Sequence, residues 1–142
     1  MTAAEAVRTG DILALEKLLA ADPSLVHAYV DGQRTLLHVV SDWPGHFPNG
    51  PATVALLVRH GANPNARFKD GKHEETPLHW AASSNDIGVL NALIVAGADI
   101  EATGAVIAGG TPIADAVAFA QWACARTWPN SEPKPISGKP LH

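Results

Sequence analysis

The residues Thr76-Pro77-Leu78-His79-Trp80-Ala81-Ala82 predict the start of a short helix. The hydroxyl of Thr76 can accept a hydrogen bond from the first turn, and Pro77 suits the first helical position, where its missing N–H removes no bond. Gly97 follows 21 residues after Thr76 and suits the left-handed conformation in which many helices end. The stretch from Thr76 to Gly97 therefore predicts two short helices joined by a turn.

Two further stretches repeat this pattern, and the N-terminus carries a weaker copy. Thr35-Leu36-Leu37-His38-Val39-Val40 lies upstream, and Thr111-Pro112-Ile113-Ala114-Asp115-Ala116 lies downstream. At the N-terminus we expect helices over residues 3–8 and 12–20. In the second of these, apolar residues recur at three- and four-residue spacing on one face, namely Ile12, Leu15, Leu18 and Leu19. Units of this kind bury their apolar faces against one another, which predicts a stack.

These residues resemble the repeat of ankyrin-repeat proteins, and the resemblance covers about residues 2–126. The chain is similar to small bacterial proteins of ankyrin repeats without an attached catalytic domain. The resemblance implies an all-α solenoid of about three to four helix-turn-helix repeats with short hairpin fingers. Asp70-Gly71 suits the turn of one finger. The resemblance also implies a structural role for His38 and His79, with each imidazole hydrogen-bonded to neighbouring backbone.

The spacing of the repeats departs from the family period of about 33 residues. Thr35 and Thr76 are 41 residues apart, and Thr76 and Thr111 are 35 apart. Gly61 follows Thr35 by 26 residues where the next repeat uses 21, so five extra residues fall within 43–51. Three prolines and two glycines in that segment exclude a regular helix and limit its freedom. We therefore expect an ordered loop between the two helices of the second repeat.

A partner-binding surface is predicted on the concave side, which the first helices of ankyrin repeats line. Residues at equal offsets from each repeat's threonine form rows, and the rows four, seven and eight positions on share one helix face. These rows combine aromatic side chains with carboxylates and the inter-helix loop, which suits a protein partner with apolar and cationic groups. The candidate contact residues are Asp42, Trp43, His46, Phe47, Trp80, Ser83, Ser84, Asp115 and Phe119.

Other interpretations of these residues stay open. Trp80 can pack between repeats, and His46 and Phe47 can fold back against the scaffold. A second functional hypothesis is a small-molecule or catalytic pocket around Trp43, His46, Trp80 and Asp115, with the loop as a lid. Titrating the Trp fluorescence with macromolecular and low-molecular-weight extract fractions would separate the two hypotheses.

The residues argue against catalysis, metal binding and nucleic-acid binding. Asp42 and Asp115 are two repeats apart, on the order of 16–20 Å, which is too far for shared acid–base chemistry. Cys124 has no neighbouring motif of an activated nucleophile, and the seven histidines lack zinc-site spacing. A net charge of −4 with scattered Lys and Arg argues against binding a phosphate backbone. With no leader or long apolar run, we expect a cytoplasmic, non-enzymatic protein without cofactor, metal or membrane contact.

The repeat pattern ends after residue 126, which predicts an ankyrin-repeat domain over 1–126 and an irregular Pro-rich tail over 127–142. Thr127-Trp128-Pro129-Asn130 interrupts a helix, and more prolines follow. The tail is interpreted either as a natural disordered terminus or as a frame-shifted reading of a further repeat, since a one-base shift through 127–130 forces helix-compatible residues. Either way the stack lacks a polar cap, so we expect self-association through its C-terminal end.

Overall fold

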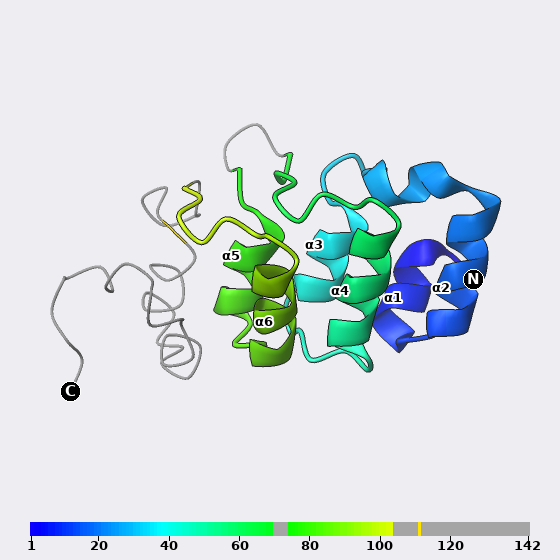
Figure 1. Ribbon diagram of the computed structural model, residues 1–142, viewed down its shortest axis with the longest axis horizontal. Coiled ribbons are helices and arrows are strands. Elements are labelled where there is room, and N and C mark those ends of the chain that lie inside the picture. The colour runs from blue at the N-terminus through cyan, green and yellow to red at the C-terminus, as the bar shows by residue number, and fades with distance from the viewer. Residues whose placement is uncertain (70–73, 104–110, 112–142) are drawn as a thin grey trace, which may run out of the picture.

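The computed structural model describes residues 1–69, 74–103 and 111, and within these ranges the chain is helical with no strand (Figure 1). The helices run in chain order as α1 (Ala3–Thr9), α2 (Ile12–Ala21), the 3-10 helix η1 (Pro23–His27), α3 (Leu36–Ser41), α4 (Gly50–Arg59), α5 (Pro77–Ser83) and α6 (Ile87–Val95). The predicted all-α repeat fold is therefore confirmed.

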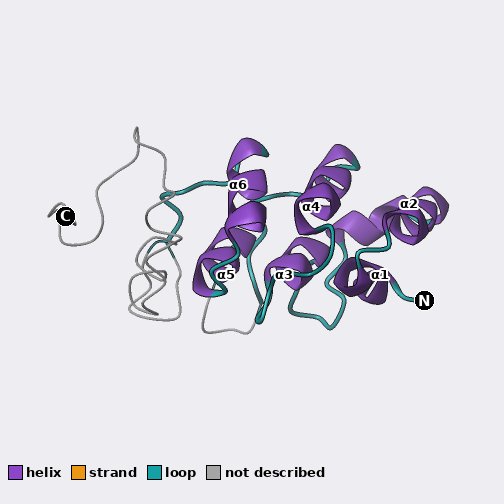
Figure 2. Cartoon of the chain, turned by 90° about the horizontal axis from the view of Figure 1, so that it is seen from below, coloured by secondary structure: helices purple, strands orange, loops and turns teal. Residues whose placement is uncertain are grey.

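The helices form two layers. Figure 2 shows α1, α3 and α5 in one row and α2, α4 and α6 in the other. Each first helix packs on the second helix of its own repeat. Along the described stack α1 packs on α3 and α3 on α5, and the second helices α2, α4 and α6 pack in sequence as well. This is the arrangement of a solenoid, in which each unit is stabilised mainly by its neighbours.

Equivalent residues begin the helices of successive repeats. Thr2, Thr35 and Thr76 precede α1, α3 and α5 in extended conformation, and each side chain pairs with the residue three positions on. Asp11 and Asp86 begin α2 and α6, where their carboxylates accept hydrogen bonds from Ala14 N and Val89 N. A cap of this kind contributes about 1 kcal/mol to helix stability, so the predicted helix starts have a direct physical basis.

The second helices of two repeats end as predicted at glycines with positive φ. Gly61 has φ 101° and Gly97 has φ 102°, a conformation that costs other residues free energy. Leucines are most of the largest fully buried side chains in the core, and each contributes about 1.5–3 kcal/mol on burial. Its fully buried leucines are Leu15, Leu19, Leu36, Leu37, Leu56, Leu57, Leu78, Leu90 and Leu93.

The five extra residues of the second repeat lie between α3 and α4, as expected, in a loop over residues 42–49. One expectation at this point is wrong: Asp42 and Trp43 do not continue the first helix. α3 ends at Ser41, and Asp42 has extended backbone with φ −70° and ψ 153°. A helix cannot continue through this point because Pro44 has no N–H to donate and disfavours helical conformation at Trp43, the residue before it.

Several predictions concern residues outside the described ranges. They are the Asp70-Gly71 turn, the repeat beginning at Thr111-Pro112 with Asp115 and Phe119, Cys124 and the tail over 127–142. Among the described helices, none has the length and apolar character needed to cross a membrane.

Candidate functional site

An aromatic cluster joins the second and third repeats through Trp80. The Trp80 ring centroid lies 5.1 Å from that of Phe68 and 4.9 Å from that of His38, with the His38 ring edge-on. The indole Nε1 donates a hydrogen bond of 3.2 Å to Glu75 Oε1. Trp80 is therefore held in place by three side chains and remains half-buried. Aromatic pairs in this geometry add about 0.5–1.5 kcal/mol beyond area burial, so packing and partner contact are both compatible with its position.

His38 lies beneath this cluster and connects two repeats. Its Nε2 lies 2.9 Å from Glu75 O, and its Nδ1 lies 2.9 Å from Thr35 Oγ1 and 3.4 Å from Thr35 N. Since Thr35 N–H donates to Nδ1, the neutral ring carries its proton on Nε2 and donates it to Glu75 O. Burial lowers the pKa of His38 to about 4, partly offset by the bond to Glu75. The predicted structural role of His38 is confirmed.

In the third repeat, His79 makes the same contacts with Thr76 that His38 makes with Thr35. Its Nδ1 lies 2.9 Å from Thr76 Oγ1 and 3.1 Å from Thr76 N, and the ring is fully buried. Within the described residues, no three His, Cys, Asp or Glu side chains gather as metal ligands.

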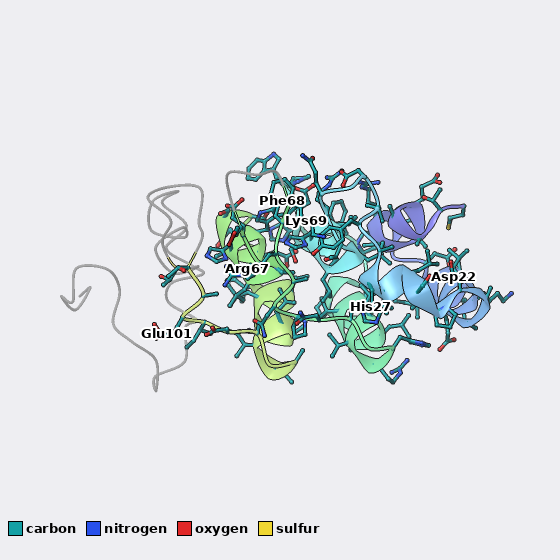
Figure 3. All side chains as sticks on the ribbon, turned by 90° about the horizontal axis from the view of Figure 1, so that it is seen from above. Asp22, His27, Arg67, Phe68, Lys69 and Glu101 are labelled. Atoms are coloured by element: carbon teal, nitrogen blue, oxygen red, sulfur yellow. The ribbon has the colours of Figure 1, made fainter. Side chains whose placement is uncertain are left out.

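The segment before α5 lies beside Trp80 and Tyr29, and its residues are not among the candidates predicted from the sequence. Arg67, Phe68 and Lys69 follow one another on the α3–α5 side of the stack (Figure 3). Lys69 N donates to Gln33 O at 3.0 Å, and its ammonium lies 4.1 Å from the centroid of the Tyr29 ring. Phe68 N donates to Glu75 O at 2.8 Å. The predicted finger turn could have pointed to Phe68, because a hairpin pairs residues on either side of its turn.

Asp42 forms part of an ion-pair network rather than a free carboxylate. Arg34 Nη1 lies 2.7 Å from Asp42 Oδ2, and Arg34 Nη2 lies 2.7 Å from Asp31 Oδ2. These groups are partly exposed, so each pair contributes at most about 1 kcal/mol. The network carries one net negative charge and places Asp42 directly before the inter-helix loop.

Trp43 is exposed over 72% of its surface, whereas Phe47 and Trp80 are half-buried. Its backbone N–H donates to Asp42 Oδ1 at 2.8 Å, and Pro44 follows it. The local backbone is thus restrained on both sides while the indole remains uncovered.

The rest of the loop is bonded to the third repeat. His46 N donates to Asp86 Oδ2 at 2.7 Å, and His46 Nε2 lies 3.2 Å from Ser84 O. Gly45 lies against the same residues, because a Cβ there would come within 3.0 Å of Ser84 Cβ. Phe47 is half-buried. His46 is therefore bonded to the scaffold and is at the same time exposed to solvent.

The remaining predicted contact residues differ in their surroundings. Ser83 is half-buried, and its hydroxyl donates to His79 O at 3.1 Å. Ser84 is buried, and its hydroxyl donates to Ser41 O at 3.1 Å, linking the second and third repeats. The pocket hypothesis requires the His46 ring to face Trp43 and Trp80. In the structure the ring instead bonds to Ser84 O.

Comparison with known proteins gives a consistent result. A family model of ankyrin repeats (3 copies) matches residues 1–104. Protein fem-1 homolog A of Bos taurus is 42% identical over 81 residues, which cover 56% of this chain and 11% of that protein. Inversin-B of Xenopus laevis is 41% identical over 64 residues, covering 45% of this chain and 6% of that protein. Palmitoyltransferase ZDHHC13 of Homo sapiens is 29% identical over 84 residues, covering 59% and 12%.

The chain thus spans at most 12% of the length of these relatives. Ankyrin repeats are generally protein–protein interaction modules and are typically non-catalytic. The threonine-capped first helices, the two helical layers and the family match over residues 1–104 together show that the chain belongs to the ankyrin-repeat family.

Proposed function

We propose that this chain is a non-enzymatic, cytoplasmic scaffold that binds a protein partner through its concave face and its inter-helix loop. The exposure of Trp43 carries the proposal. Its side chain keeps 72% of its surface uncovered, although Trp is usually largely buried and is enriched among the residues that dominate interface energetics. An uncovered indole on a restrained backbone suits an interface because little backbone entropy is lost when a partner covers it.

The proposed contact surface extends from Trp43 to the half-buried Trp80, with Phe68 added beside it. Two features favour a protein partner over a small ligand: the contact residues come from two repeats and a loop, and several present backbone and side-chain groups that are already paired. The proposed residues are Asp42, Trp43, His46, Phe47, Trp80, Ser83 and Ser84, together with Asp115 and Phe119 outside the described ranges.

An affinity pull-down from an extract of the native host tests this proposal. Tagged wild type, Trp43→Ala and Trp80→Ala are compared with Leu13→Ala, a matched control whose side chain is 70% exposed on α2. We expect one partner band that both Trp variants lose and Leu13→Ala keeps. A band kept by both Trp variants would contradict the proposal, and circular dichroism melts verify that each variant is folded.

We also propose that the C-terminal end of the stack self-associates. The support comes from the sequence, which places the apolar Ile113, Val117 and Trp122 in a segment that provides no polar cap. Light scattering over a wide concentration range should show a rising average mass, and a constant monomer mass would refute self-association.

A further inference from the structure

The turns between paired helices form one continuous edge of the stack, braced by the loop of the second repeat. Asn49 Nδ2 donates to Gly10 O in the first repeat at 2.9 Å. Pro48 also packs on Gly10, leaving no room for a Cβ there. On its other side the loop bonds to Asp86 through His46 N at 2.7 Å. The loop therefore connects the helix–helix turns of all three described repeats.

The charge of this edge is negative. Its turn residues are 9–11, 42–49 and 84–86, and they include Asp11, Asp42 and Asp86 but no Lys or Arg. Arg34, which lies just before the capping Thr35 of α3, neutralises part of this charge by pairing with Asp42. Asp11 is exposed to solvent, whereas Asp86 is buried beneath the loop. A cationic group that approaches this edge is attracted by the carboxylates.

Trp43 lies in the middle segment of this edge and presents an open aromatic face. A Lys ammonium or an Arg guanidinium gains about 0.5–2 kcal/mol when it lies over a Trp ring. Asp42 is adjacent in sequence and bonded to Trp43 N, and the network that it forms with Arg34 and Asp31 keeps one net negative charge near such a cation. The aromatic face and the negative potential thus favour the same chemical class of partner.

We infer that the turn edge is a docking surface for a basic peptide segment of another protein, with an Arg or Lys side chain on the Trp43 indole. This inference deepens the proposed function, since it rests on partner binding at Trp43 and names the chemistry of the partner. It assigns the basic segment to the loop end of the proposed contact surface, at Trp43, rather than to the concave face around Trp80 and Phe68.

Fluorescence anisotropy with a labelled peptide of alternating Arg and Gly tests the inference, with a Glu-Gly peptide of equal length as the charge control. At about 50 mM salt, where screening is modest, wild type should bind the Arg-Gly peptide and not the Glu-Gly peptide. Trp43→Ala should weaken binding by about two- to thirtyfold, since a cation–π contact of about 0.5–2 kcal/mol is lost and 1.4 kcal/mol is tenfold. Unchanged binding in Trp43→Ala, or equal binding of both peptides, would overturn the inference.

Matched charge variants locate the surface. Asp11 and Asp22 each accept a hydrogen bond at a helix start, and they flank α2 at its two ends. Asn is an equally good cap, so both Asn variants retain the fold and remove one charge. Asp11→Asn should weaken peptide binding by about twofold, whereas Asp22→Asn, about 15 Å away, should not. Equal effects of the two variants would indicate non-specific attraction and would reject the inference.

Failure of this inference can be distinguished from failure of the proposed function. If the Arg-Gly peptide does not bind while both Trp variants lose the natural partner, the turn edge is rejected and the proposed function stands. If the peptide binds through Trp43 while the partner band survives in Trp80→Ala, the turn edge is supported and the concave face is rejected. Peptide binding that Trp80→Ala abolishes and Trp43→Ala leaves intact rejects the turn edge.

Discussion

Acidification should unfold this protein partly through His38. The folded state holds the ring neutral, because burial lowers the pKa from 6.5 to about 4. Protonation would give the ring a second N–H, at Nδ1, and this N–H would face the N–H donor of Thr35 at 3.4 Å. Between pH 6.5 and about 4 the unfolded chain therefore binds a proton that the folded chain does not. The stabilising contribution is fully present above the unfolded pKa and is lost as the pH falls toward the folded pKa.

The magnitude follows from the two pKa values. A difference of about 2.5 pKa units corresponds to about 3 kcal/mol, since each unit is worth 1.36 kcal/mol. Between pH 7 and pH 5 the linkage relation gives a loss of about 2 kcal/mol, because the folded state still resists protonation at pH 5. This loss is a large share of the unfolding free energy of a typical domain, which is about 5–15 kcal/mol.

Urea unfolding followed by far-UV circular dichroism at pH 7, 6 and 5 measures this loss. In His38→Gln the ring no longer titrates, so the fall in unfolding free energy over this interval should be smaller by about 2 kcal/mol. His60→Gln serves as the control for the substitution itself, because it replaces an exposed histidine. Equal pH slopes in wild type and His38→Gln would refute the reasoning.

Three substitutions and one control substitution test the packing by urea unfolding. The hydroxyl of Thr53 is buried without a hydrogen-bond partner, so Thr53→Val should raise the unfolding free energy by about 1 kcal/mol, and a decrease would contradict this account. Gly10→Ala should lower the unfolding free energy by at least about 2 kcal/mol, because the added Cβ would overlap Pro48 O at φ 70°. Gly32→Ala is the control: with φ 79° and open space around it, the substitution should cost only about 1 kcal/mol. Equal costs of the two substitutions would rule out the clash. Asp86→Ala should lower the unfolding free energy by about 2 kcal/mol, because the cap of α6 and the hydrogen bond from His46 N are both lost. An unchanged urea midpoint would show that these bonds do not stabilise the stack.

Local sequence chemistry was sufficient to predict the repeat units. Thr76-Pro77 starts a helix because the threonine side chain bonds within its own first turn, and Gly97 ends one because the required φ suits glycine. The first two helices were predicted over residues 3–8 and 12–20 and run over Ala3–Thr9 and Ile12–Ala21. Such signals involve residues three or four positions apart, so the sequence displays them directly.

The tertiary structure alone decided what surrounds each candidate contact residue. Trp80 packs on Phe68, and His46 bonds to Asp86, which is 40 residues away in sequence. Equal offsets from the repeat threonines could not show that α3 ends at Ser41, before Asp42 and Trp43. Contacts across repeats depend on the path of the intervening loops, and burial is a property of the assembled stack. The sequence therefore determined the units and their order, whereas folding determined which aromatic side chain stays exposed to solvent.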